Sequence, residues 1–205
     1  VLNPTNCDEA TVTVTVTAPV IDAVNDTGAA VNGATGGTSF TNVLVNDTLD
    51  GQAVVAANVT TTFVSSTHAG VTLSGLNVVV AAGTPAGSYS LDYKICEHLN
   101  PANCDTATVT VPVAAAVIDA VNDTGVSVNG AAGGTSFANV LGNDTLNGAA
   151  VVAADVTTTF VSSTHAGVSL SGLSVVGAAG TPAGSYSLVY RICEVLNPTN
   201  CDEAT

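Results

Sequence analysis

The sequence predicts an all-β protein composed of tandem β-sandwich domains placed end to end. Three observations support this fold class. The chain repeats itself at a constant offset of 97 residues, with 86 identities among the 108 overlaid positions. Valine and threonine alternate along short runs, which is the period-2 pattern of strands with one buried face. Turn-forming Gly, Asn and Pro residues separate these runs, and no helical periodicity of useful length is present.

The repeat also sets the expected domain boundaries. Its unit exceeds the length of a solenoid repeat and fits a complete small domain. We expect one domain at residues 20–116 and a second at 117–205, which lacks most of its last strand. Residues 1–19 correspond to the C-terminal hairpin and last strand of a preceding repeat. The sequence is therefore expected to be one window on a longer array, and exchange of residues 12–17 between chains is the alternative.

Each strand of the first domain is expected from its own pattern. Thr11–Thr17 alternates strictly between threonine and valine. In the second copy Pro112 replaces Thr15, and because proline cannot donate to a ladder, this strand is expected at a sheet edge or with a bulge. Val20–Asp26 follows after a connection of only a few residues, which favours a stiff junction. Five more strands are expected at Ser39–Val45, Ala53–Val64, Gly70–Leu73, Leu76–Ala81 and Gly87–Cys96.

About seven short strands in each unit predict an immunoglobulin-like β-sandwich. The last of these runs alternates large apolar residues on one face, and this face is expected to fill the core with Tyr89, Leu91, Tyr93 and Ile95. The Gly-x-Tyr sequence that opens this strand resembles a tyrosine corner, in which the hydroxyl ties an end loop to the sandwich. We assign this structural role to Tyr89 and to its copy Tyr186.

Paired cysteines predict one disulfide in each repeat. Cys96 and Cys104 are eight residues apart on the two arms of an expected hairpin, and Cys193 and Cys201 repeat this spacing. Cys7 is the fifth, and its partner is expected outside the chain. Structural disulfides indicate an oxidising, extracytoplasmic compartment. Zinc is the alternative, but each repeat offers only two thiols and no C-x-x-C knuckle.

The composition excludes several classes of function. The chain has 16 acidic residues and only two basic ones, for a formal net charge of −14. No Lys/Arg stripe can neutralise phosphates, so no nucleic acid is expected as a partner. No apolar run is long enough to span a bilayer, so no membrane insertion is expected. No ordered nucleophile, histidine and acid accompany one another, and we expect neither an enzyme nor a catalytic residue.

Acidic residues at the start of each domain are candidates for a calcium site. Oxygen ligands at a domain junction could bind the ion and stiffen the array. The alternative is that these Asp and Asn residues cap and turn the backbone, because six or more oxygens are needed and only three side chains per junction are evident. Without this ion no cofactor is expected. The candidates are Asp22, Asn25 and Asp26, with their copies Asp119, Asn122 and Asp123.

Two segments carry a resemblance to a known family. Asp22-Ala-Val-Asn-Asp26 followed by Asn42-Val-Leu-Val-Asn-Asp47 resembles bacterial immunoglobulin-like and cadherin-like surface repeats. Tyr190–Asp202, which contains the two-cysteine hairpin, resembles repeats of giant secreted adhesins of Bacteroidota, including gliding-motility surface proteins. The chain departs from calcium-binding cadherin-like repeats because it lacks dense D-x-D-x-D-G loops.

The resemblance implies a structural role outside the cell. It implies a stalk segment of a cell-surface adhesin or filament that projects an adhesive region away from the cell, with no cofactor. Its partners would be neighbouring repeats of the same polypeptide, and a surface or glycan ligand would be bound by a distal region. The alternatives are an extracellular filament subunit that self-assembles by strand exchange, and a repeat module that binds a glycan or protein.

Overall fold

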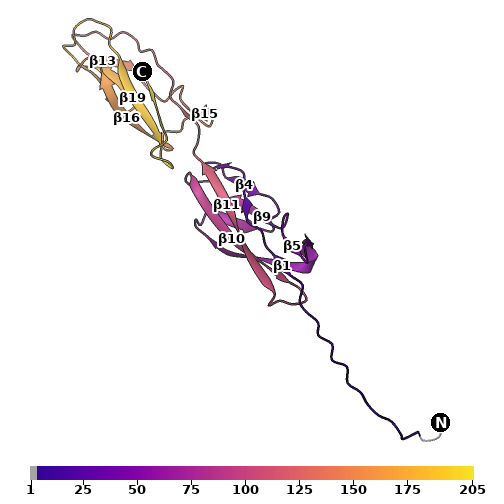
Figure 1. Ribbon diagram of the computed structural model, residues 1–205. Helices are drawn as coiled ribbons and strands as arrows, with labels where there is room; N and C mark the ends of the chain where they lie inside the picture. Colours follow the sequence, from indigo (N-terminus) through magenta and orange to yellow (C-terminus); the bar gives the residue numbers. More distant parts are fainter. Residues whose placement is uncertain (1–3) are drawn as a thin grey trace.

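The computed structural model describes residues 4–205 and shows two elongated β domains that follow one another along a common direction (Figure 1). Each domain has its own hydrophobic core, and the first and second cores share no residue. Within residues 4–205 the only helical element is a single 3-10 turn, η1 (Ala56–Asn58). The protein is therefore all-β.

The larger sheet of the first domain has five strands. Its centre is the long hairpin of β10 (Gly87–Glu97) and β11 (Cys104–Ala114), which pair in antiparallel fashion. β7 (Val59–Ser66) pairs with the other edge of β10. Two short strands, β2 (Asp26–Thr27) and β3 (Val31–Asn32), pair in parallel with β11. β2 and β3, near the start of the domain, are thus neighbours of β11, its last strand.

The opposite sheet of the first domain is smaller. It has the order β4-β9-β8, and a three-stranded accessory sheet of order β1-β5-β6 lies at the end where the chain enters. The two main sheets together form an immunoglobulin-like β-sandwich. The bounds of these strands are β1 (Ile21–Asp22), β4 (Gly37–Phe40), β5 (Thr48–Leu49), β6 (Gln52–Ala53), β8 (Val71–Ser74) and β9 (Asn77–Val80).

The second domain repeats most of this arrangement in three sheets of order β12-β14-β15, β13-β18-β17 and β16-β19-β20. Its last two strands, β19 and β20, are shorter than β10 and β11, and no strand of residues 4–205 corresponds to β2 or β3 there. The bounds are β12 (Ile118–Asp119), β13 (Gly134–Phe137), β14 (Thr145–Leu146), β15 (Ala149–Ala150), β16 (Val156–Ser163), β17 (Val168–Ser171), β18 (Ser174–Gly177), β19 (Leu188–Glu194) and β20 (Cys201–Ala204).

Alternation along β10 and β11 fills the first core. Leu91, Tyr93 and Ile95 of β10 are completely buried, as are Val109 and Val111 of β11. Successive side chains of a strand point to opposite faces, so threonines on the other face of β11 remain near solvent. The second core contains fewer buried residues, because no segment of residues 4–205 takes the place that residues 109–114 occupy in the first domain.

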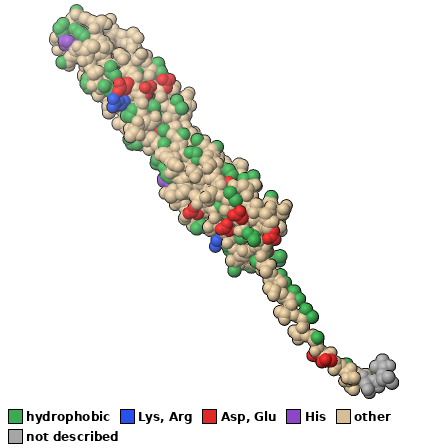
Figure 2. Space-filling model, in the orientation of Figure 1, with side chains coloured by type: hydrophobic (Ala, Val, Ile, Leu, Met, Phe, Trp, Pro, Cys, Tyr) green, Lys and Arg blue, Asp and Glu red, His purple; other side chains and the backbone are tan. Residues whose placement is uncertain are grey.

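The strand expected at residues 11–17 is not a β-strand in the structure. Residues 10–19 form an extended segment without a ladder partner, and Val12, Val14 and Val16 are 83%, 76% and 88% exposed. A lone strand has no neighbour to accept its backbone hydrogen bonds. Figure 2 shows this segment as a narrow arm with a row of hydrophobic side chains. Residues 1–3 of the expected preceding hairpin lie outside the described residues, and Cys7 is exposed and unpaired among the described cysteines.

Two other expected strands are shorter than predicted. β4 ends at Phe40 because Asn42 adopts a left-handed conformation (φ 59°), which turns the chain. β7 begins at Val59 because η1 occupies the preceding residues. After β4 the apolar residues that suggested a longer strand lie in a turn, where Val43 and Leu44 are buried. Before β7 the η1 turn buries no residue, and Val55 is 59% exposed.

The position expected for Pro112 is also wrong. β11 has strands on both sides and pairs with β10 without a register shift, so Pro112 lies neither at an edge nor at a bulge. The carbonyls of Thr110 and Ala114 accept hydrogen bonds from the backbone N–H groups of Gly28 and Gly33, which follow β2 and β3. The Pro112 nitrogen faces the same side, opposite the segment between β2 and β3, which does not pair with β11. The lost donor therefore breaks no strand hydrogen bond.

Candidate functional site at the interdomain joint

In the linker between the domains (residues 115–117), Ala116 and Val117 form hydrogen bonds with the second domain. Ala116 is only 4% exposed; its N–H donates to Glu194 Oε2 (3.3 Å), and its carbonyl accepts from Asn200 Nδ2 (2.8 Å). The next residue, Val117, exchanges two hydrogen bonds with Asn147: its N–H donates to Oδ1 (3.0 Å), and its carbonyl accepts from the backbone N–H (2.7 Å). The linker is thus fixed to the second domain.

The loop of the second disulfide hairpin supplies the side chains that hold the linker. We call its residues Glu194, Asn197 and Asn200 the clasp. Glu194 is 2% exposed, and its Oε2 accepts hydrogen bonds from Asn197 Nδ2 and Asn200 Nδ2, both at 2.9 Å. The Cys193–Cys201 disulfide joins the two strands directly below the loop. A buried carboxylate that accepts several hydrogen bonds fixes the positions of its donors, because leaving a buried donor unpaired costs free energy.

Direct hydrogen bonds connect the two domains across the joint. Asn197 Oδ1 accepts from the Ala86 N–H of the first domain at 2.6 Å. The side-chain amides of Asn32 and Asn147 also meet, with Asn32 Nδ2 donating to Asn147 Oδ1 at 2.8 Å. Two loops of each domain therefore meet at the joint. This arrangement restricts bending at the linker.

The entry to the first domain contains corresponding contacts, except that Pro19 has no N–H to donate to Glu97 as Ala116 does to Glu194. Asn103 Nδ2 donates to the Pro19 carbonyl (2.8 Å) and Glu97 Oε2 accepts from Asn103 (3.3 Å). The Val20 N–H donates to Asp50 Oδ1 (2.8 Å), as Val117 does to Asn147. Asp50 and Asn147 both stand in left-handed turn positions (φ 50° and 53°). An acid and an amide both supply the accepting oxygen, so either residue can form this hydrogen bond.

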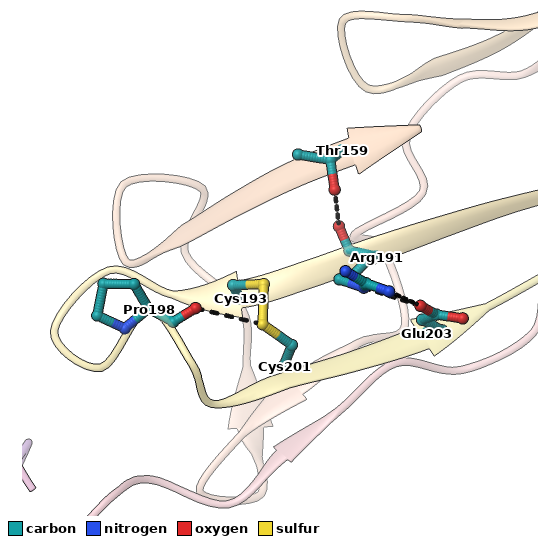
Figure 3. Close-up of polar contacts among 6 residues, drawn as sticks. All are labelled: Thr159, Arg191, Cys193, Pro198, Cys201 and Glu203. Atoms are coloured by element: carbon teal, nitrogen blue, oxygen red, sulfur yellow. Dashed lines mark hydrogen bonds and ion pairs between the residues drawn. A yellow bond between two sulfur atoms is a disulfide. The ribbon is translucent and has the colours of Figure 1, made fainter. Parts of the chain in front are cut away.

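The two disulfides of the sequence prediction are both formed. Cys96–Cys104 and Cys193–Cys201 each join directly opposite residues of a hairpin. Figure 3 shows the second disulfide beside Pro198, with Arg191 and Glu203 further along the same two strands. Arg191 Nε donates to Glu203 Oε1 at 2.8 Å, but the two side chains are 47% and 42% exposed, so this ion pair adds little stability.

One calcium candidate of the first domain, Asp26, forms a buried acidic pair with Asp47, and the candidates Asp22 and Asn25 lie near this pair. Asp47 is completely buried, accepts the Val24 N–H at 2.8 Å and lies 3.0 Å from the Tyr93 hydroxyl. Asp26 is 7% exposed beside Asp47, while Asp22 is exposed in β1. Asn25 Oδ1 instead accepts the backbone N–H of Thr108. The copies Asp119, Asn122 and Asp123 take equivalent places, and Asn122 Oδ1 accepts the Thr205 N–H.

Burial disfavours ionisation of this pair. Burial, followed by the negative charge of Asp47, raises the pKa of Asp26 to about 6, and burial raises the pKa of Asp47 as well. Asp26 Oδ2 is buried without a hydrogen-bond partner in the described structure, as is Asp123 Oδ2. Among residues 4–205, no three His, Cys, Asp or Glu side chains are grouped closely enough to hold a metal ion. Burial therefore leaves Asp26 more readily protonated than an exposed aspartate.

The tyrosines assigned to the corner bind the preceding loop. The Tyr89 hydroxyl donates to the Pro85 carbonyl at 2.9 Å, and the Tyr186 hydroxyl donates to the Pro182 carbonyl at 3.0 Å. Their rings also pack against His68 (centroids 4.8 Å apart) and its copy. The histidines, which the sequence leaves without a role, thus cover the corner tyrosines.

The residues of the clasp were not identified from the sequence, although a signal was present. The string C-E-x-L-N-P-x-N-C occurs in both complete hairpins, so Glu194, Asn197 and Asn200 have exact counterparts in the first domain. The signal is the regular spacing of one Glu and two Asn between the cysteines. The contacts that they make are distant in sequence, between 78 and 111 residues for those to the linker and the first domain.

No protein-family model and no curated protein sequence matches the chain. Solved structures similar to it include the EC22-24 fragment of mouse cadherin-23 (14% identity, TM-score 0.37), immunoglobulin domains 1–4 of Sidekick-1 (13%, 0.31) and an endo-fucoidan hydrolase of glycoside hydrolase family 107 (15%, 0.36). Each match covers 91% of this chain, which spans 62%, 49% and 28% of those chains, respectively. Because these TM-scores are low, the fold assignment rests on the sheet topology.

No helix within residues 4–205 is both long and apolar enough to cross a membrane.

Proposed function

We propose that this chain is a structural stalk segment of a long, repetitive, cell-surface adhesin, in which rigid joints between β-sandwich domains transmit position and force. The observation that carries the proposal is the joint itself. The linker is hydrogen-bonded to the second domain, and two side-chain contacts then cross to the first domain. A flexible tether needs none of these contacts, whereas a rod needs them at every junction.

The construction of the clasp supports a repeating rod. The clasp of Glu97, Asn100 and Asn103 on Pro19 is built like the clasp of Glu194 on Ala116, so one design serves successive junctions. At a rise of about 3.3 Å per residue, the 11 residues of β10 give each domain a length of about 35 Å along the rod. Reach then grows in proportion to the number of repeats.

The chemistry of the hairpins supports a location outside the cell. Both disulfides close the loops that hold the joints, and such bonds persist in oxidising compartments. A distal region of the adhesin would contact the surface or glycan ligand, and this segment would act without cofactor or catalysis. The resemblance of the hairpin sequence to Bacteroidota adhesins supports a gliding-motility or related bacterial surface protein.

Small-angle X-ray scattering of the 205-residue chain tests the rod. The expected result is a pair-distance distribution of two domains at one preferred separation. A joint variant, Asn32→Ala with Asn197→Ala, removes both interdomain contacts and should broaden this distribution. The matched control is Asn129→Ala with Asn100→Ala, which changes the same positions in the other copies, where no domain is contacted in residues 4–205.

The outcome decides between a rod and a tether. If the unsubstituted chain scatters as two domains without a preferred separation, the rigid-stalk proposal is wrong. If the joint variant and the control broaden the distribution equally, the two cross-domain contacts are not its cause. Antibody labelling of intact, unpermeabilised source cells tests the surface location, and labelling only after permeabilisation would contradict it.

A further inference from the structure

Three Asn-Gly dipeptides occur in the chain, at residues 32–33, 129–130 and 147–148. Glycine has no side chain to shield its backbone nitrogen, so this nitrogen can approach the side-chain amide carbon of the preceding asparagine. Attack on that carbon closes a five-membered succinimide ring and releases ammonia. In a folded protein, the hydrogen bonds of the Asn-Gly peptide group decide whether its nitrogen can turn toward the carbon.

The first of these dipeptides is held by backbone hydrogen bonds on both sides of its peptide group. Gly33 is buried, and its N–H donates to the Ala114 carbonyl at 2.9 Å. The carbonyl of the same peptide group, which belongs to Asn32, accepts the Gly36 N–H at 2.9 Å. The Gly33 nitrogen therefore cannot reach the Asn32 side chain unless both hydrogen bonds break.

The second dipeptide is held through its carbonyl. The Asn129 carbonyl accepts the N–H groups of Ala132 at 3.1 Å and of Gly133 at 2.8 Å. Because a peptide group is planar, fixing this carbonyl also fixes the direction of the Gly130 nitrogen. Succinimide formation here requires the loss of both hydrogen bonds, which should slow it at least about 10-fold.

The peptide group of the third dipeptide is unrestrained. Asn147 and Gly148 form the two-residue turn between β14 and β15, with φ values of 53° and 73°, and both are exposed. Within residues 4–205, neither the Asn147 carbonyl nor the Gly148 N–H forms a hydrogen bond. No atom lies within 4 Å of the place that a side chain on Gly148 would take, so water reaches the turn. Nothing in the backbone hydrogen bonding opposes rotation of this peptide group.

The interdomain joint polarises the amide that would be attacked. Asn147 Oδ1 accepts hydrogen bonds from the Val117 N–H at 3.0 Å and from Asn32 Nδ2 at 2.8 Å. When the Gly148 nitrogen adds to Asn147 Cγ, negative charge develops on Oδ1. Donors at these distances stabilise such a charge. The contacts that hold the joint thus favour the reaction.

We propose that Asn147 is a self-modifying site that converts to aspartate and isoaspartate through a succinimide. The Gly148 nitrogen gives its proton to solvent and forms a bond to Asn147 Cγ. The Cγ–Nδ2 bond breaks, and ammonia leaves with a proton taken from solvent. Water then opens the ring at Cγ to give aspartate, or at the backbone carbonyl carbon to give isoaspartate. No electron is transferred, and water is the only co-reactant.

The first domain shows that the turn accepts the aspartate product. Asp50 occupies the corresponding turn (φ 50°), and its Oδ1 accepts the Val20 N–H at 2.8 Å. Aspartate at position 147 would accept the Val117 N–H in the same way. Isoaspartate differs, because its main chain passes through Cβ and Cγ and lengthens the turn by one atom. The aspartate form therefore keeps the joint, whereas the isoaspartate form displaces the oxygen that holds it. This inference does not depend on the stalk proposal.

Hydroxylamine tests the proposal, because it opens a succinimide and cleaves the chain at that bond. The folded 205-residue chain, treated at mildly alkaline pH, should give fragments 1–147 and 148–205. Each disulfide lies within one fragment, so the two separate without reduction. The chain unfolded in urea should be cut at all three Asn-Gly bonds. In peptide maps of the folded chain aged without hydroxylamine, Asn147 should deamidate at least about 10-fold faster than Asn32 and Asn129.

Two variants serve as matched controls. Asn147→Asp presents a carboxylate carbon, which resists attack, so it should be cut far more slowly at this bond while its turn keeps the form seen at Asp50. Asp50→Asn creates the same Asn-Gly turn in the first domain and should add a cut after residue 50. Both substituted side chains are exposed, so both variants should fold. An isoaspartyl methyltransferase should methylate the aged unsubstituted chain faster than the aged Asn147→Asp chain.

Three results would overturn the proposal. A folded chain that stays uncut after Asn147, although the unfolded chain is cut there, would show that the turn keeps the Gly148 nitrogen away from Cγ. Equal rates at the three asparagines of the folded chain would show that backbone hydrogen bonds do not select the site. Deamidation to aspartate without isoaspartate would indicate direct hydrolysis of the amide and exclude the ring.

Discussion

Removal of the second disulfide should loosen both the second domain and the joint. The perturbation is Cys193→Ala with Cys201→Ala, which opens the hairpin while leaving its strands able to pair. This hairpin presents Glu194, Asn197 and Asn200 to the linker and to the first domain. Its loop is therefore the element whose order the disulfide maintains. The change should affect more than local stability.

The cost follows from the length of the closed loop. The cysteines are eight residues apart, and chain-entropy theory gives about 2.5 kcal/mol for a loop of this size. A domain of this length loses about 4–8 °C in melting temperature for each kcal/mol, so a decrease of about 10–20 °C is expected for the second domain. The first domain, which retains Cys96–Cys104, should melt at an almost unchanged temperature.

The repeat supplies a matched control for this experiment. Cys96→Ala with Cys104→Ala opens a hairpin of the same length in the first domain, so it should cause a similar loss of stability there. Its clasp acts on Pro19 and not on the joint between the two domains. Calorimetry reports both transitions, and X-ray scattering reports the joint. Only removal of the second disulfide should broaden the interdomain distances.

Two results would refute this reasoning. A melting temperature of the second domain that falls by less than about 3 °C would show that strand pairing alone orders the hairpin. Equal broadening by both double variants would show that the clasp loop does not hold the joint.

Three other outcomes are expected. Tyr93→Phe removes the hydroxyl bound to Asp47 and should lower stability by about 1–3 kcal/mol in urea unfolding, and a neutral effect would contradict the buried network. Because folding raises the pKa of Asp26 to about 6, the folded state binds a proton more tightly than the unfolded chain, and stability should fall as pH rises from about 4 to 6. Asp26→Asn should flatten this dependence and stabilise the protein at pH 7.5, and an unchanged pH profile would contradict the raised pKa of Asp26. Adding calcium or EGTA should leave the melting temperature unchanged within about 1 °C, because Asp47 already accepts two hydrogen bonds. A clear rise of the melting temperature with calcium would instead place an ion between Asp26 and Asp47.

The strand pattern and turns could be predicted from the sequence because they depend on near neighbours. Alternation placed Leu91, Tyr93 and Ile95 in the core, and all three are fully buried. Asp50 and its copy Asn147, each followed by a glycine, have the left-handed backbone that an Asp-Gly or Asn-Gly hairpin turn adopts. The eight-residue spacing of the cysteines predicted both disulfides of the described structure. In each case the relevant partner lies within one strand or hairpin.

Errors arose where a distant partner decides the local structure. Residues 11–17 have a perfect strand pattern, yet they form no strand because nothing lies beside them. The same pattern at residues 108–114 becomes an internal strand of the first domain. Pro112 is accommodated there because the segment between β2 and β3 does not pair with β11 beside it. No local rule distinguishes these cases.

The sequence by itself determined that this protein is a tandem of disulfide-bonded β-sandwich domains, since alternation, turn chemistry and cysteine spacing act over a few residues. Only the tertiary structure decided how the domains join. The clasp depends on Glu194, Asn197 and Asn200 meeting backbone groups that lie 78 to 111 residues away. These contacts are decided by long-range satisfaction of buried backbone groups, which a repeat pattern does not specify.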